Sequence, residues 1–169
     1  MNYKESFKIE PSGEREIVMT RVFDVTPDLL FDALTKPELV KRWLLGPPGW
    51  SMPVCEIDLK VGGSYRYVWR NEDGREMGMG GKYREIVRPK RIVHSEKFDE
   101  AWYPGEALVT TTLVEKGGTT TLITTMLMES REARDEVLES GMESGVAVSY
   151  DRLEKILSPQ LAKEGASKS

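Results

Sequence analysis

The chain contains few of the residues on which disulfides and metal sites depend. Its 169 residues include one cysteine, Cys55, and one histidine, His94. A single cysteine excludes a disulfide within the chain. A zinc site usually takes several cysteine or histidine ligands, so this composition argues against one. We therefore expect neither a metal nor a cofactor.

Long apolar runs and an excess of positive charge are also absent. No apolar stretch reaches the ~18 residues that a membrane-spanning helix needs. The first ten residues mix lysine and glutamate with few apolar positions, which is not the pattern of a signal peptide, so we expect a cytoplasmic protein. The formal net charge of -4 argues against nucleic-acid binding through a general basic surface.

The remaining composition is typical of one globular domain. Hydrophobic residues make up 39% of the chain and charged residues 31%, and the length allows one complete hydrophobic core. No internal repeat or linker divides the sequence. We predict a flexible N-terminal arm over residues 1–13, a single domain over 14–158 and a polar C-terminal tail over 159–169.

Strand-like segments fill most of the predicted domain. Residues 15–25 are rich in β-branched and aromatic side chains and are predicted as the first strand. Two short helices follow over 27–34 and about 35–44, each with a proline near its start. Short turns separate the later strands, which indicates antiparallel neighbours. These strands are predicted over 51–59, 64–70, 76–87, 91–98, 106–115 and 119–128.

One long helix is predicted to close the domain, over about residues 130–157, with Ser130 as its N-terminal cap. One helix cannot fill all the space over a large sheet, so the sequence predicts a gap in which a small molecule can bind. Gly141 and Gly145 each cost about 1 kcal/mol relative to Ala inside a helix. They indicate either a bend at Gly141 or space beneath Gly145 and Val146.

Several short stretches resemble one superfamily. They are PELVKRW (37–43) with the Gly-Pro loop after it, EIDLKVGGSY (56–65), YREI (83–86), RIVHSE (91–96), GMESG (141–145) and DRL (151–153). Together they resemble the START-like or helix-grip superfamily (SRPBCC), which includes birch-pollen-allergen-like and polyketide-cyclase-like domains. Within it, the chain is similar to the branch related to the activator of heat-shock-protein ATPase. The likeness extends from about residue 15 to residue 157.

The resemblance implies an α+β helix-grip fold. In such a fold, a curved antiparallel sheet of about seven strands wraps around a long C-terminal helix, and two short helices follow the first strand. The resemblance alone does not choose a function, because relatives include ligand carriers, cyclases, dehydratases and co-chaperone domains.

Aromatic side chains share one face of a predicted strand, because Tyr65, Tyr67 and Trp69 alternate along it. One interpretation is ordinary core packing. The other is a cavity wall that offers tyrosine hydroxyls and an indole N–H to a ligand. Met79 and Tyr83 share a face of the next strand and allow the same two interpretations.

His94 and Glu96 lie on the same strand face as Ile92 and Phe98. If the apolar pair points inward, so do His94 and Glu96. A buried Glu–His pair can be a general acid/base couple, or it can be a hydrogen-bonded polar pair near the cavity rim. No nucleophile or oxyanion motif accompanies them, so they stay candidates and no catalytic residue is assigned.

The predicted cavity lies between the sheet and the closing helix, at the helix centre. The residues expected to line it are Trp43, Tyr67, Trp69, Met79, Tyr83, His94, Glu96, Phe98, Met142, Gly145 and Val146.

Three hypotheses for function follow. The first is binding of a small hydrophobic or amphipathic molecule in this cavity. The alternative is an enzyme of the cyclase, dehydratase or hydrolase kind that uses His94, Glu96 and Tyr67 or Tyr83. The third, implied by the resemblance, is a co-chaperone-like protein-interaction module. A monomer and a homodimer are both compatible with the sequence.

Overall fold

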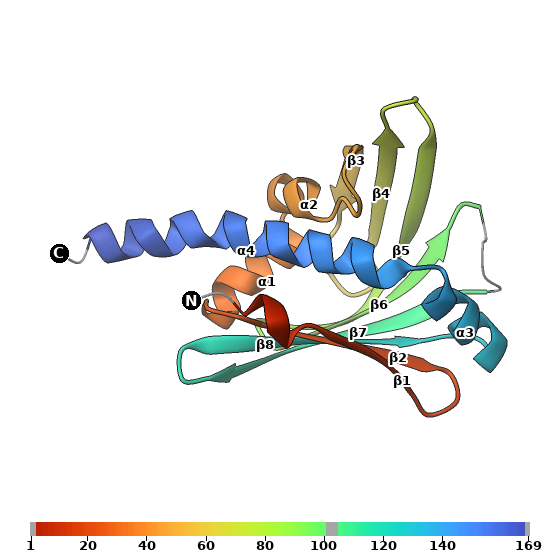
Figure 1. Ribbon diagram of the computed structural model, residues 1–169, viewed down its shortest axis with the longest axis horizontal. Coiled ribbons are helices and arrows are strands. Elements are labelled where there is room, and N and C mark those ends of the chain that lie inside the picture. The colour runs from red at the N-terminus through yellow and green to blue at the C-terminus, as the bar shows by residue number, and fades with distance from the viewer. Residues whose placement is uncertain (1–2, 101–104, 168–169) are drawn as a thin grey trace.

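The computed structural model of the protein describes residues 3–100 and 105–167, with side chains only as far as residue 158. Within these residues, eight strands form one sheet in which every neighbouring pair is antiparallel (Figure 1). The strands are β1 (Lys8–Ser12), β2 (Glu16–Phe23), β3 (Trp50–Ile57), β4 (Ser64–Asn71), β5 (Glu76–Val87), β6 (Arg91–Phe98), β7 (Ala107–Lys116) and β8 (Thr119–Leu127).

The strand order across the sheet is β1-β2-β8-β7-β6-β5-β4-β3. Strands β3 to β8 therefore lie beside one another in the order of the sequence, and β2 pairs with the last of them. The pairing of β2 with β8 runs from Glu16 opposite Leu127 to Phe23 opposite Thr120. This pairing brings together two strands that are far apart in the sequence.

In the described part of the chain, four α-helices lie on one side of the sheet: α1 (Pro27–Thr35), α2 (Pro37–Trp43), α3 (Arg131–Glu139) and α4 (Met142–Ser167). Figure 1 shows α4 crossing the sheet, with α1 and α2 at one end and α3 at the other. Proline at the first position starts both α1 and α2, where its missing N–H has no helical partner to lose. Ser130 caps α3, since its side chain accepts a hydrogen bond of 3.1 Å from the Ala133 amide.

Alternation along the strands places the core between the sheet and these helices. Every second residue of β2 is buried, including Ile17 and Phe23, which are 0% and 1% exposed. Leu153 of α4, also 0% exposed, packs into the same core cluster as Phe23. No helix in the described part of the chain is long and apolar enough to cross a membrane.

The sequence predicts the α+β fold correctly but undercounts its strands. The eighth strand is β1, which forms where the sequence predicts a flexible arm. Ile9 pairs with Met19 of β2, and Phe7 and Ile9 pack against the core. Pairing along the whole of β1 satisfies the free edge of β2, and two apolar residues were too few to indicate this.

The closing helix is also different from the prediction, because it is divided into α3 and α4. Gly141 stands at the break with a φ of +83°, a left-handed conformation that strongly favours glycine. The structure has the bend that was one of the two alternatives, and the other, space beneath Gly145 and Val146, is present as well. At the other end, α4 continues past Pro159 to Ser167, where the sequence predicts a polar tail.

The break predicts opposite effects for two glycines four residues apart. Gly141→Ala should lower the free energy of unfolding by about 1 kcal/mol, because Ala is strained at positive φ. Gly145→Ala should leave it unchanged or raise it by up to about 1 kcal/mol, because Ala is the better helix former. A Cβ at Gly145 would sit 3.5 Å from Pro47 Cδ, an ordinary contact, and one at Gly141 would touch nothing.

Chemical denaturation of the two variants and the parent protein measures both effects. Equal effects of the two substitutions would contradict this account of the break.

Candidate functional site

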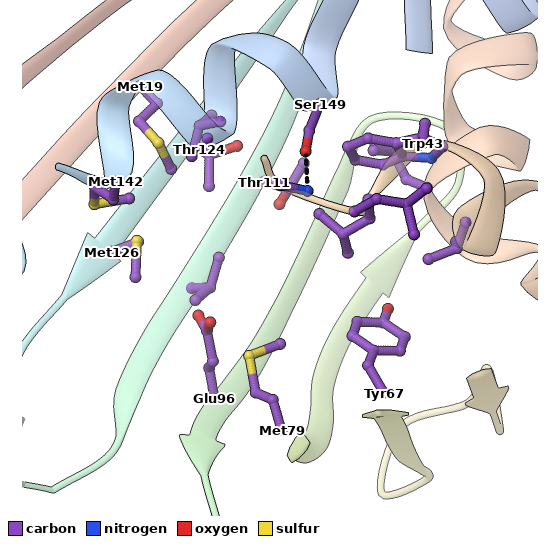
Figure 2. A pocket seen from close by; sticks show the side chains of 18 of the residues that line it. Met19, Trp43, Tyr67, Met79, Glu96, Thr111, Thr124, Met126, Met142 and Ser149 are labelled. Atoms are coloured by element: carbon purple, nitrogen blue, oxygen red, sulfur yellow. Dashed lines mark hydrogen bonds between the residues drawn. The ribbon is translucent and has the colours of Figure 1, made fainter. Parts of the chain in front are cut away.

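A cavity of about 490 Å³ lies between the concave side of the sheet and α4. Five residues of α4 within 142–150 line it, so it sits at the middle of the segment that the sequence predicts as one helix. Figure 2 shows side chains from both sides of this space. All the residues that the sequence predicts for a cavity line this one: Trp43, Tyr67, Trp69, Met79, Tyr83, His94, Glu96, Phe98, Met142, Gly145 and Val146.

One wall of the cavity is aromatic. Tyr65, Tyr67 and Trp69 of β4 are 3%, 8% and 8% exposed, while Arg66 and Arg70 on the opposite face point outward and pair with acidic side chains. Tyr67 meets Trp69 edge-on at 5.9 Å between ring centroids. The predicted alternation of this strand therefore puts three rings side by side on the inner face.

Most polar tips of this wall are already bonded to backbone. The Trp69 indole N–H donates to the Leu44 carbonyl at 2.7 Å, and the Trp43 indole N–H donates to the Ala33 carbonyl at 2.8 Å. The Tyr65 hydroxyl donates to the Ser95 carbonyl at 2.6 Å. The interpretation that an indole N–H is offered to a ligand is therefore wrong for Trp69, which presents a ring face instead.

The remaining hydroxyls of this wall are neutral and mutually bonded. Tyr67 and Tyr83 share a side-chain hydrogen bond, and burial raises the pKa of both phenols above their ordinary value. Burial also raises the pKa of the neighbouring Cys55 thiol to about 11. Neither a phenolate nor a thiolate nucleophile is therefore available here at neutral pH.

His94 lines the cavity as a neutral imidazole. Its Nδ1 lies 3.1 Å from the Ser95 carbonyl oxygen, and since a carbonyl only accepts, Nδ1 carries the hydrogen. Burial lowers the pKa of His94 below its ordinary value. The ring also meets Tyr65 edge-on at 5.0 Å between centroids, so its position is fixed on two sides.

Glu96 points its carboxyl group into the cavity (Figure 2). Burial raises the pKa of this carboxyl group from its ordinary 4.5 to about 7, and no hydrogen bond contributes to the shift. Among the described residues, none donates a hydrogen bond to Glu96 or forms an ion pair with it. Glu96 is thus a buried acid that the surrounding side chains leave unsatisfied.

The two catalytic candidates share the cavity but do not form a couple. Among the described residues, the His94 ring has one hydrogen-bond partner, the Ser95 carbonyl, which lies 3.1 Å from Nδ1. His94 does not contribute to the pKa of Glu96. Residues i and i+2 of a strand extend from the same face in parallel, so their polar ends do not point at each other. General acid/base transfer between them is therefore not assembled in this arrangement.

A second wall is rich in methionine, and the sequence prediction included only Met142 of it and missed Met19 and Met126. Figure 2 shows Met19, Met126 and Met142 together across the cavity from Tyr67. Met19 and Met126 come from β2 and β8, which are far apart in sequence and neighbours in the sheet. The alternation along each strand indicates that Met19 and Met126 face inward. The pairing of β2 with β8, which brings the two residues together under α4, is not visible in the sequence.

The loop after α2 closes one end of the cavity. The Gly46 amide donates to Ser149 Oγ at 2.9 Å, drawn as a dashed line in Figure 2, and Arg152 Nη1 donates to the Gly46 carbonyl at 2.6 Å. Pro47 packs beside Gly145. The backbone N–H and C=O of Gly46 thus both form hydrogen bonds with side chains of α4.

This geometry can be compared with known proteins. The sequence model described as Activator of Hsp90 ATPase homolog 1-like protein matches residues 24–158. The chain belongs to this family. The resemblance predicted from the sequence is therefore confirmed.

Solved structures of related proteins share the fold of this family member. A protein from Rhodobacter sphaeroides is 35% identical with a TM-score of 0.86, and the match covers 90% of this chain and 98% of that one. An AHSA1-like protein from Aeromonas hydrophila is 17% identical with a TM-score of 0.69, over 83% of this chain and 93% of that one. Comparison with curated proteins gives no match.

The cavity of this family member holds acidic and imidazole groups but no cluster suited to a metal. Within residues 3–100 and 105–158, no group of three or more His, Cys, Asp or Glu side chains could hold an ion.

The raised pKa of Glu96 predicts how the free energy of unfolding depends on pH. The folded protein holds the Glu96 proton more tightly than the unfolded chain, so stability falls as pH rises from about 4.5 to about 7. The full effect above pH 7 is about 3 kcal/mol. Glu96→Gln keeps the shape and removes the charge, so the variant should be about 3 kcal/mol more stable than the parent at pH 8 and similar near pH 4.5.

Urea denaturation at both pH values measures this difference. His94, Tyr67 and Tyr83 face the same cavity and are present in both proteins, so their titration cancels. Glu115→Gln, on the exposed end of β7, is the matched control and should show no such trend. A gain for Glu96→Gln that is the same at both pH values would contradict the assignment.

Proposed function

We propose that this protein binds a small hydrophobic or amphipathic molecule in the cavity between the sheet and α4. The observation that supports this is a space of about 490 Å³, a volume within the range of about 300–1,000 Å³ typical of small-molecule sites. Its walls are aromatic rings on one side and thioethers on the other. Both kinds of surface favour an apolar ligand over water.

The chemistry of the walls suits a ligand of irregular shape. Methionine side chains are flexible and polarizable, so they adapt to ligands that rigid aliphatic residues would exclude. Glu96 and the bare Nε2 of His94 supply polar contacts within this apolar space. An apolar body with one polar end therefore matches the cavity better than a uniformly polar metabolite.

The loop at Gly46 and Pro47 gives such a ligand a route into the cavity. Two hydrogen bonds, from the Gly46 amide to Ser149 and from Arg152 to the Gly46 carbonyl, join it to α4. Breaking two hydrogen bonds requires only a few kcal/mol. Access therefore needs a local opening and leaves the sheet intact.

An enzymatic role of the cyclase, dehydratase or hydrolase kind is the second candidate. It is favoured by the position of His94 and Glu96, which both line the cavity. Binding is the better-supported function because no hydrogen bond couples this pair and no activated nucleophile accompanies it. A co-chaperone-like role is the third hypothesis, and it rests on the family description alone.

Filling the cavity should weaken the binding of an apolar dye. Val146→Trp puts an indole into the cavity, and Val114→Trp puts the same indole on the outer face of β7, where Val114 is 46% exposed. In fluorescence titrations, Nile red should bind the parent and the Val114→Trp variant alike and bind the Val146→Trp variant at least about tenfold more weakly, a loss of about 1.4 kcal/mol.

Circular dichroism of both variants should confirm that each is folded. Equal binding of Nile red to the two variants, or no binding to the parent protein, would exclude the cavity as an apolar site.

A further inference from the structure

The cavity holds one negative charge and nothing to balance it. Among the described residues that line it, Glu96 is the only carboxylate, and none is lysine or arginine. No described residue forms a hydrogen bond or ion pair with Glu96. A lone carboxylate in apolar surroundings is destabilising unless a cation or hydrogen-bond donors accompany it.

The donors around Glu96 are committed elsewhere. The Tyr65 hydroxyl bonds to the Ser95 carbonyl, and the Trp69 indole bonds to the Leu44 carbonyl. The hydroxyl groups of Tyr67 and Tyr83 bond to each other. His94 gives its Nδ1 hydrogen to the Ser95 carbonyl. No hydrogen bond joins any of these groups to Glu96, so a ligand that brings its own donors would satisfy this carboxylate.

The aromatic side chains add a second attraction for positive charge. Trp69 and Phe98 stack with 6.5 Å between ring centroids, and Tyr67 meets Trp69 edge-on. All three rings line the same cavity as Glu96. Ring faces attract an ammonium group, and the attraction is stronger where water is excluded. The carboxylate and the rings together favour a ligand with a positive charge.

We propose that the ligand is a hydrophobic amine whose ammonium group pairs with the Glu96 carboxylate while its apolar body lies against the rings and thioethers. This inference rests on the proposed function, because it names the ligand class of the same cavity. An ammonium group supplies both the missing cation and up to three N–H donors. A fatty acid is disfavoured, because it would place a second carboxylate beside Glu96 with no cation among the described lining residues.

A matched series of naphthalene probes tests the charge preference. We would titrate the protein at pH 8 by calorimetry with 1-naphthylmethylamine, 1-naphthalenemethanol and 1-naphthoic acid, which share one ring system and differ in charge. The amine should bind at least about tenfold more tightly than the alcohol, and the acid should bind most weakly. Nile red provides the charge-independent measure of the cavity.

Glu96→Gln identifies the group responsible. The variant should bind amine and alcohol with similar affinity, and it should still bind Nile red, which carries no ammonium group. Glu115→Gln, which removes an exposed carboxylate on β7, should keep the full preference for the amine. Retention of Nile red binding shows that a lost preference does not come from loss of the fold.

The outcomes separate this inference from the function on which it rests. If the parent binds Nile red and the alcohol but has no preference for the amine, the cavity is a binding site and the amine is the wrong ligand class. The same conclusion follows if Glu96→Gln keeps the preference. If neither Nile red nor the alcohol binds the parent protein, the proposed function itself fails.

Discussion

The concave face of an eight-stranded sheet is wider than one helix can cover, and the rest of this structure depends on that mismatch. α1 and α2 cover one end and α3 the other, but α4 alone crosses the middle. Under its residues 142–150 the facing side chains leave about 490 Å³. Larger side chains on α4 or a second long helix would be needed to fill this space. The cavity is thus a consequence of the architecture, and its lining decides what it can hold.

Two inward-facing charged side chains, Arg21 in the core and Glu96 in the cavity lining, are treated differently by the fold. Arg21 of β2 is 1% exposed, yet it pairs with Asp151 at 3.4 Å and Glu154 at 3.3 Å and donates to the Val22 carbonyl at 2.6 Å. These contacts join the sheet to α4 and satisfy the guanidinium. Glu96 has no comparable partner among the described residues. A charge that the protein satisfies itself stabilises the fold, whereas one that it leaves unsatisfied is available for a ligand.

The sequence predicted the elements and the inward faces because both depend on local pattern. Alternation along β4 gave the aromatic wall, and parity along β6 put His94 and Glu96 on the inner face. Contacts between distant segments were not predictable in this way. The methionine wall needs β2 beside β8, and the loop closure needs Gly46 against Ser149 and Arg152. The lack of any hydrogen bond between His94 and Glu96 likewise depends on side-chain geometry, which periodicity does not determine.

A crystal structure of the protein purified from cells without detergent tests the central claim most directly. The account predicts electron density for one non-protein molecule between α4 and the sheet, with its polar end within hydrogen-bonding distance of the Glu96 carboxylate. A cavity closed by inward movement of α4, or one that contains only water while Glu96 pairs with another side chain of the protein, would contradict it.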